Sequence, residues 1–109
     1  MISDRKAAIA AYKEQKTFAG IFVIRSKASA ERWVGQTANL EKIQNRIWFT
    51  LRQGSHTCAS LQAAWTAYGP DNLLLEECER LDEDTPYVRD ALLKERVLHW
   101  RAELGAEAV

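Results

Sequence analysis

Two aromatic residues, each close to a glycine, are the side chains with the clearest chemical potential in this chain. Residues 20–35 read GIFVIRSKASAERWVG, in which Phe22 and Trp33 stand on two strand-like stretches joined by a polar turn. Phe22 has no hydroxyl and the indole of Trp33 can only donate a hydrogen bond, so neither can take a proton from water as a general base. Their rings could instead stack on a nucleobase, another aromatic ligand or a side chain of a partner.

Cationic side chains that could bind the anionic end of such a ligand occur in the same half of the chain. Arg25 ends the first stretch, Arg46 lies in the next predicted helix, and His56 stands between a glycine and a later helix. A guanidinium or an imidazole beside an aromatic surface is a suitable setting for a small anion.

The two stretches that carry the aromatics predict a β-hairpin. GIFVIR is a continuous apolar run rich in β-branched residues, as in a strand buried on both faces. SKASAE is the polar turn and ERWVGQT is the returning strand. A third strand is predicted over residues 72–81, NLLLEECERL, whose acidic residues are typical of the edge of a sheet.

Apolar residues at helical spacing, between capping and ending residues, predict four helices. The first is an accessory N-terminal helix over residues 3–16, capped by Ser3. The second is capped by Asn39 and ended by Gly54, and the third is capped by Thr57 and ended by Gly69. The fourth is a long helix over residues 86–104 that begins with Thr85 and Pro86. Their apolar stripes after the hairpin are Leu40, Ile43, Ile47 and Leu51; Leu61, Ala64, Trp65 and Tyr68; and Val88, Leu92, Leu93, Val97, Trp100 and Leu104.

This order of elements is an α+β plan around a small three-stranded antiparallel sheet flanked by helices. A chain of 109 residues, 47% of them apolar, can bury one core, so we expect a single domain over residues 1–109 with its core at about 19–104.

Composition limits the classes of function and location. Residues 1–56 hold ten Lys or Arg and four Asp or Glu, and residues 57–109 hold five and eleven, so the halves carry +6 and −6 and could form a basic face. Without a signal peptide or a long uncharged apolar run, we expect a cytoplasmic protein that does not enter a membrane. Cys58 and Cys78 are expected to be separate reduced thiols.

These motifs resemble the GIY-YIG nuclease superfamily. The GIF and WVG stretches stand where that family has its signature strands, with Gly20 and Gly35 as the motif glycines. WVGQTANLEK and LLKERVLHW resemble later parts of the family's core, over about residues 19–104. The segment GSHTCASLQAAWTAYG is similar to the homing-endonuclease type at Gly54, His56, Leu61, Gln62, Trp65 and Gly69.

The resemblance implies a catalytic site whose usual residues are replaced. Two strand tyrosines, a helix arginine and a metal-binding glutamate of the family correspond to Phe22, Trp33, Ile43 and Val97. Val97 cannot coordinate Mg²⁺, which requires oxygen ligands. We therefore expect a catalytically degenerate member, with no catalytic or metal-binding residue assigned.

The same positions predict an apolar and aromatic surface, unless these side chains simply fill the core. The expected binding residues on and around it are Phe22, Arg25, Trp33, Gln36, Arg46 and His56.

Three functional hypotheses stay open. The first is a non-catalytic module without a cofactor, similar to the small GIY-YIG-like modules that occur alone in bacteria or joined to LuxR- and ArsR-type regulators; it would bind nucleic acid, a small anionic or aromatic ligand, or a protein. The second is a divergent Mg²⁺-dependent DNA endonuclease that uses Arg46, His56 and one of Glu76, Glu77 or Glu95. The third is an interaction module, for example a homodimer, with exposed Trp and Leu side chains at its interface.

Overall fold

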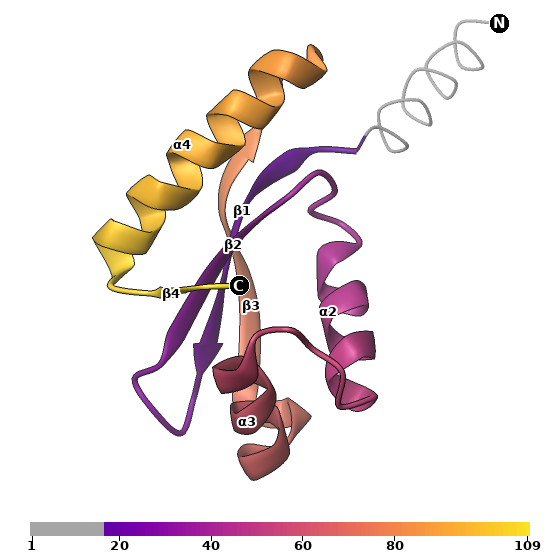
Figure 1. Cartoon of the computed structure of the whole chain (residues 1–109), viewed down its shortest axis with the longest axis vertical. Helices are drawn as coiled ribbons and strands as arrows, with labels where there is room; N and C mark the ends of the chain where they lie inside the picture. The colour runs from indigo at the N-terminus through magenta and orange to yellow at the C-terminus, as the bar shows by residue number, and fades with distance from the viewer. Residues whose placement is uncertain (1–16) are drawn as a thin grey trace, which may run out of the picture.

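The computed structural model describes residues 17–109, so the helix predicted over residues 3–16 lies outside the described residues. The elements, in chain order, are β1 (Ala19–Ser26), β2 (Arg32–Thr37), α2 (Ile43–Arg52), α3 (Ala59–Tyr68), the short 3₁₀ helix η1 (Pro70–Asn72), β3 (Leu73–Leu81), α4 (Pro86–Leu104) and β4 (Glu107–Ala108). The hairpin, the later helices and the third strand all lie where the sequence predicts them, and the α+β class is confirmed (Figure 1).

The strands form one four-stranded mixed sheet in the order β3-β1-β2-β4. β1 pairs antiparallel with both β2 and β3, and β4 pairs parallel with β2 so that Glu107 lies opposite Trp33. The sheet therefore has one strand more than the predicted three, and it is not purely antiparallel. β4 was missed because two residues are too few to produce an alternating pattern.

The sheet carries a separate core on each of its faces. Successive side chains of a strand point to opposite sides, and β1 is apolar on both. Phe22 and Ile24 pack in one cluster with side chains of α2 and α3. Ile21 and Val23 pack in the other cluster with Leu93 of α4. The sheet thus separates α2 and α3 from α4, as Figure 1 shows.

The predicted apolar stripe is buried in the middle of α2, only Leu93 of the predicted stripe is buried in α4, and the pattern fails at two helix ends. Ile43, Ile47 and Leu51 of α2 are all buried. Tyr68, the last residue of α3, is 53% exposed, and Val88 in the first turn of α4 is 40% exposed. Both residues stand in a terminal turn of their helix, where the apolar spacing continues in the sequence but the side chain no longer packs against the core.

The four motif glycines stand where a side chain would be unfavourable. A Cβ on Gly20 would collide with the backbone carbonyl of Glu79, and one on Gly35 would collide with the ring of Phe22. Gly54 and Gly69 follow α2 and α3 with φ angles of +70° and +83°, a region that favours glycine.

The two cysteines are free thiols, and they lie on opposite sides of the sheet. Cys58 packs against the cluster under α2 and α3, and Cys78 against the cluster under α4. Within residues 17–109, no helix is both long enough and apolar enough to cross a membrane.

Candidate functional site

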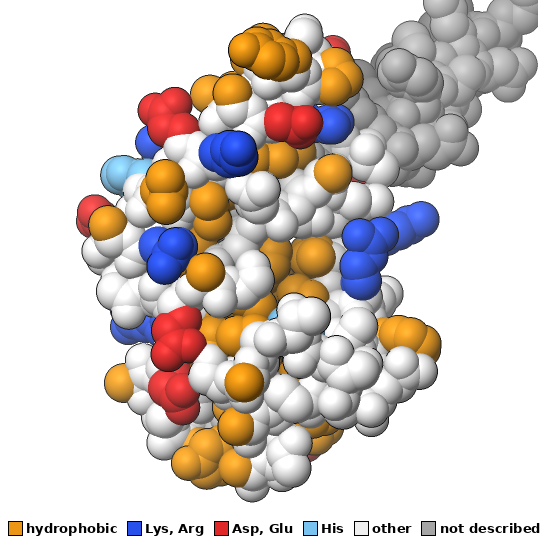
Figure 2. Space-filling model, viewed as in Figure 1, with side chains coloured by type: hydrophobic (Ala, Val, Ile, Leu, Met, Phe, Trp, Pro, Cys, Tyr) orange, Lys and Arg blue, Asp and Glu red, His pale blue; other side chains and the backbone are white. Residues whose placement is uncertain are grey.

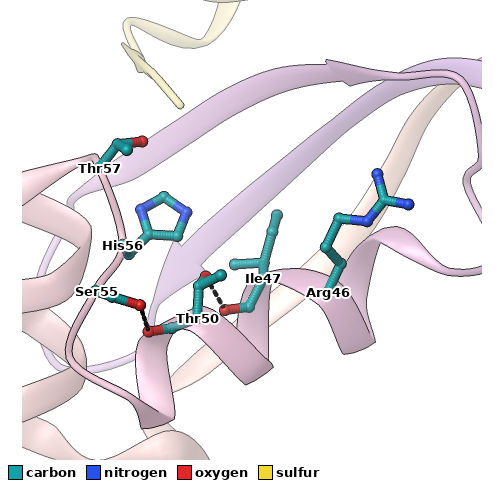
Figure 3. A pocket seen from close by; sticks show the side chains of 6 residues that line it. All are labelled: Arg46, Ile47, Thr50, Ser55, His56 and Thr57. Carbon is teal, nitrogen blue, oxygen red and sulfur yellow. Dashed lines mark hydrogen bonds between the residues drawn. The ribbon is translucent and has the colours of Figure 1, made fainter.

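A small open pocket lies between α2 and the loop that leads to α3. Its volume is about 190 Å³. The side chains that line it are Arg46, Ile47, Thr50, Ser55, His56 and Thr57. Figure 3 shows Arg46 and His56 on either side of Ile47, with Arg46 held by α2 and His56 by the loop. Two of the predicted site residues are therefore brought to one pocket.

Hydrogen bonds fix the position and the tautomer of His56. Its backbone N–H donates to Oε1 of Gln62 at 3.3 Å, and Gln62 Nε2 donates to the carbonyl of Leu51 at the end of α2. Nδ1 of His56 accepts a hydrogen bond of 3.0 Å from the backbone N–H of Cys58. This bond requires an unprotonated Nδ1, so the proton of the neutral ring lies on Nε2, which is left as a donor. Partial burial also lowers the pKa of His56 below its usual value.

The hydroxyl groups of the pocket differ in whether their protons are already used. Thr50 donates to the carbonyl of Ile47 at 2.8 Å, and Ser55 donates to the carbonyl of Thr50 at 3.4 Å. Thr57 makes no hydrogen bond with the residues that the structure describes. The N-cap of α3 is Cys58 and not Thr57, so the predicted capping role of Thr57 is wrong and its hydroxyl stays available to the pocket.

The layer formed by α2 and α3 carries positive charge without nearby carboxylates in its sequence. Residues 42–70 contain Lys42, Arg46 and Arg52 and no Asp or Glu. None of these three basic side chains forms an ion pair within residues 17–109. Figure 2 shows basic side chains both beside α2 and on the side of α4, while the carboxylates visible in this view lie on the side of α4 and the hairpin. The fold therefore keeps part of the charge asymmetry seen in the sequence.

Phe22 and Trp33 are core residues and not parts of an open surface. Their exposed fractions are 2% and 0%, and both belong to the cluster under α2 and α3, as does Ile43. The indole N–H of Trp33 donates to Oγ of Ser60 at 2.9 Å, which satisfies its hydrogen-bonding need inside the protein. The predicted ligand-binding surface is thus wrong for these positions, because α2 and α3 cover them.

Other predicted residues lie on the opposite face of the sheet. Val97 packs in the cluster under α4, so it cannot share a surface with Phe22. Gln36 is paired with Ile21, whose side chain points toward α4. Arg25 alternates with Ile24 along β1 and forms an ion pair of 3.5 Å with Glu76. The expectation that Arg25 and Gln36 rim the same site as His56 is therefore wrong.

The three glutamates considered for a metal-dependent site do not join the pocket. Glu95 is exposed on α4, across the sheet from His56. Glu76 is engaged with Arg25, and Glu77 accepts a hydrogen bond of 2.8 Å from Nε of Arg80. Within the described part of the chain, no group of three His, Cys, Asp or Glu side chains converges as a metal site would require.

Sequence reasoning missed the hydroxyl groups of the pocket and the position of Glu107. Thr50 stands four residues after Arg46, a helical spacing that could have placed both on one side of α2. Glu107 accepts a hydrogen bond from Oγ of Ser60, the same hydroxyl that accepts from Trp33. No sequence signal marked Glu107, because its position depends on the return of the chain to β2 after α4.

Comparison with solved structures identifies the fold. The described chain is similar to the catalytic domain of the intron endonuclease I-TevI in a variant form, with a TM-score of 0.70 and 24% sequence identity over 81% of this chain and 84% of that chain. It is also similar to the catalytic domain of the homing endonuclease I-TevI, with a TM-score of 0.66 and 25% identity over 84% and 97% of the two chains. No protein-family model matches the chain, and no curated protein matches it. The chain thus has the α+β fold of a GIY-YIG nuclease catalytic domain.

Proposed function

We propose that this chain is a nucleic-acid-binding module with a GIY-YIG nuclease fold that holds a backbone phosphate without cleaving it. The observation that carries the proposal is the pocket between α2 and the loop that leads to α3, which both Arg46 and His56 line. The relatives in fold are endonuclease domains, which makes nucleic acid the natural class of ligand.

The donors of the pocket suit a phosphate group. Arg46 offers a guanidinium fork that no carboxylate of residues 17–109 neutralises, and such a fork matches two phosphate oxygens. His56 in its neutral form offers the Nε2 proton, and Thr57 offers a hydroxyl proton. An anion in this pocket would therefore meet three donors from two elements, with no carboxylate among the residues that line it.

The absence of cleavage is proposed from the positions that would have to activate water. Phe22 and Trp33 hold no proton acceptor and are buried under α2 and α3. Glu95, one of the three glutamates considered for Mg²⁺, stands on α4 across the sheet. In this proposal, the module that binds nucleic acid in this way is regulatory and cytoplasmic.

The binding test compares arginines on the two faces of the sheet. Affinity for a short duplex and for a single strand is measured over a series of salt concentrations. Arg46→Ala should weaken binding and lower the slope of log affinity against log salt by about one unit, as expected for one lost phosphate contact. His56→Ala should weaken binding as well. Arg25→Ala, which removes an exposed arginine from the opposite face, should leave affinity and slope unchanged. Equal effects of Arg46→Ala and Arg25→Ala would contradict the proposal that the pocket binds the phosphate.

A cleavage assay separates this proposal from the divergent endonuclease. The chain is incubated with single- and double-stranded DNA and Mg²⁺ or Mn²⁺, beside Arg46→Ala and Glu95→Ala variants. We expect no product with any of the three proteins. Metal-dependent cutting that disappears in both variants would overturn the non-cleaving proposal and support the endonuclease.

A further inference from the structure

The outer surface of α2 carries a phenylalanine between two arginines. Arg46, Phe49 and Arg52 are spaced three residues apart, and residues at this spacing are neighbours on one side of a helix. All three are exposed, and the ring of Phe49 is exposed to 57%. We call these three residues the α2 stripe.

The charge around the α2 stripe favours a polyanion over a protein with a mixed surface. Neither Arg46 nor Arg52 forms an ion pair with another residue in the described part of the chain. The nearest acidic residues in sequence are Glu41 before α2 and Asp71 after α3. The flat apolar ring of Phe49 thus lies between two cations, and no carboxylate of residues 17–109 forms an ion pair with either of them.

A ring flanked by cations is the arrangement that single-stranded nucleic acid recognises. Successive bases of an unpaired strand present their faces to aromatic side chains, while the backbone phosphates lie near arginines. In a duplex the base faces are stacked on one another, so an exposed ring on a helix surface meets only the sugar-phosphate backbone or a groove.

We infer that the α2 stripe binds single-stranded nucleic acid, with one base stacked on Phe49 and the neighbouring phosphates on Arg46 and Arg52. The inference rests on the proposed function and adds a preference for unpaired strands. Arg46 also lines the pocket with His56, so the pocket and the α2 stripe share this residue.

The test uses a thymine homopolymer of about 20 nucleotides and a duplex of the same length at one fixed low salt concentration. Phe49→Ala and Phe49→Leu remove the flat ring, and the second of these keeps an apolar side chain. Phe49→Trp keeps a stacking ring. Tyr87→Ala is the matched control, because Tyr87 is an 85% exposed aromatic on α4, across the sheet. Thermal unfolding of every variant confirms that the fold is retained.

We expect Phe49→Ala and Phe49→Leu to weaken single-strand binding by on the order of tenfold and to change duplex binding far less. Phe49→Trp should retain single-strand binding, with its fluorescence quenched by the oligonucleotide, and Tyr87→Ala should behave as the wild type. Equal losses for both nucleic acids, or no loss with Phe49→Ala, would overturn the inference. If the inference fails in this way but Arg46→Ala still weakens binding, the proposed function stands without the preference for single strands. Absence of binding by the wild-type chain to either nucleic acid would instead overturn the proposed function.

Discussion

The ring of Phe22 lies against Gly35 on the neighbouring strand. The two residues are paired directly across β1 and β2, and a Cβ on Gly35 would stand 2.6 Å from Cζ of Phe22 and 2.9 Å from the carbonyl oxygen of Val109. The aromatic of the first motif strand thus occupies the space that the glycine of the second leaves open. Phe22 and Gly35 therefore pack against one another beneath α2 and α3, and this structural role does not depend on any catalytic activity.

Gly35→Ala is therefore expected to destabilise the protein. The added methyl group must displace either a buried ring or backbone, and overpacking of this kind costs about 1–3 kcal/mol. Urea unfolding at neutral pH measures the change in the free energy of unfolding.

A double substitution tests whether Phe22 is the obstacle. Phe22→Leu shortens the side chain opposite Gly35, so the combination of Phe22→Leu with Gly35→Ala should be less destabilising than the sum of the two single changes. We expect a coupling of at least about 0.5 kcal/mol. Strict additivity would show that the methyl group is accommodated elsewhere.

A second prediction concerns Glu79, which joins β3 to α4. Its Oε1 accepts hydrogen bonds from Nε1 of Trp100 at 2.9 Å and from Nε of Arg96 at 2.7 Å. The bond from Trp100 is the main cause that lowers the pKa of Glu79 below its usual value of 4.5, and Arg96 adds to it. Since the folded-state pKa is the lower one, this stability is present above pH 4.5 and is lost as the pH falls through the folded-state pKa.

Trp100→Phe should reduce the free energy of unfolding by about 1 kcal/mol at neutral pH, a modest value because Glu79 is partly exposed. The difference between wild type and variant should shrink when urea unfolding is repeated at pH values below 4.5. A difference that is constant from neutral to acidic pH would mean that the variant loses packing and not the bond to a carboxylate.

A third prediction follows from the neutral state of His56. Partial burial lowers its pKa below the usual 6.5, and its Nδ1 accepts a hydrogen bond from Cys58. A histidine with a lowered folded-state pKa stabilises the fold fully above pH 6.5, and this stability is lost as the pH falls through the folded-state pKa. His56→Gln should therefore flatten the pH dependence of stability below pH 6.5.

His99→Gln serves as the control for His56→Gln, because His99 lies on α4 and is exposed. Urea unfolding of all three proteins between pH 7.5 and pH 5 decides the matter, with the range chosen around the usual histidine pKa of roughly 6.5. Identical pH dependence for wild type and His56→Gln would show that His56 does not titrate differently in the folded state.

Local signals in the sequence were sufficient for most of the fold. The β-branched run that contains Phe22 predicted β1, and the Thr85–Pro86 pair marked the start of α4. Both features depend on neighbours in sequence, which is why they could be predicted. Asn39 lies in the turn that leads into α2, where its Oδ1 accepts hydrogen bonds from the backbone N–H groups of Glu41 and Lys42. The N-cap of α2 itself is Lys42, so the predicted capping of this helix by Asn39 is wrong.

The candidate site was harder to predict because its composition depends on which face of the sheet each helix covers. Ile43 and Val97 are both apolar residues at helical spacing, and nothing in their spacing reveals that the sheet separates them. Arg46 and His56 do line one pocket, because α2 and the loop after it are adjacent in the chain, and their role in binding stays a prediction. Arg25 was assigned to the wrong face of the sheet, because the side chains of successive residues in a strand point to opposite faces.

A last prediction distinguishes the core role of Trp33 from the binding role that its motif position suggested. Trp33 is fully buried, and its indole N–H donates to Ser60. Trp33→Phe should therefore destabilise the fold by about 1–3 kcal/mol, and Ser60→Ala, which leaves the indole N–H without its partner, by about 1–2 kcal/mol. The double variant should lose less than the sum, because both changes remove the same bond. Nucleic-acid affinity, measured well below the unfolding temperature of each variant, should stay unchanged in Trp33→Phe. Loss of affinity with unaltered stability would instead show that Trp33 contacts the ligand and that α3 moves to expose it.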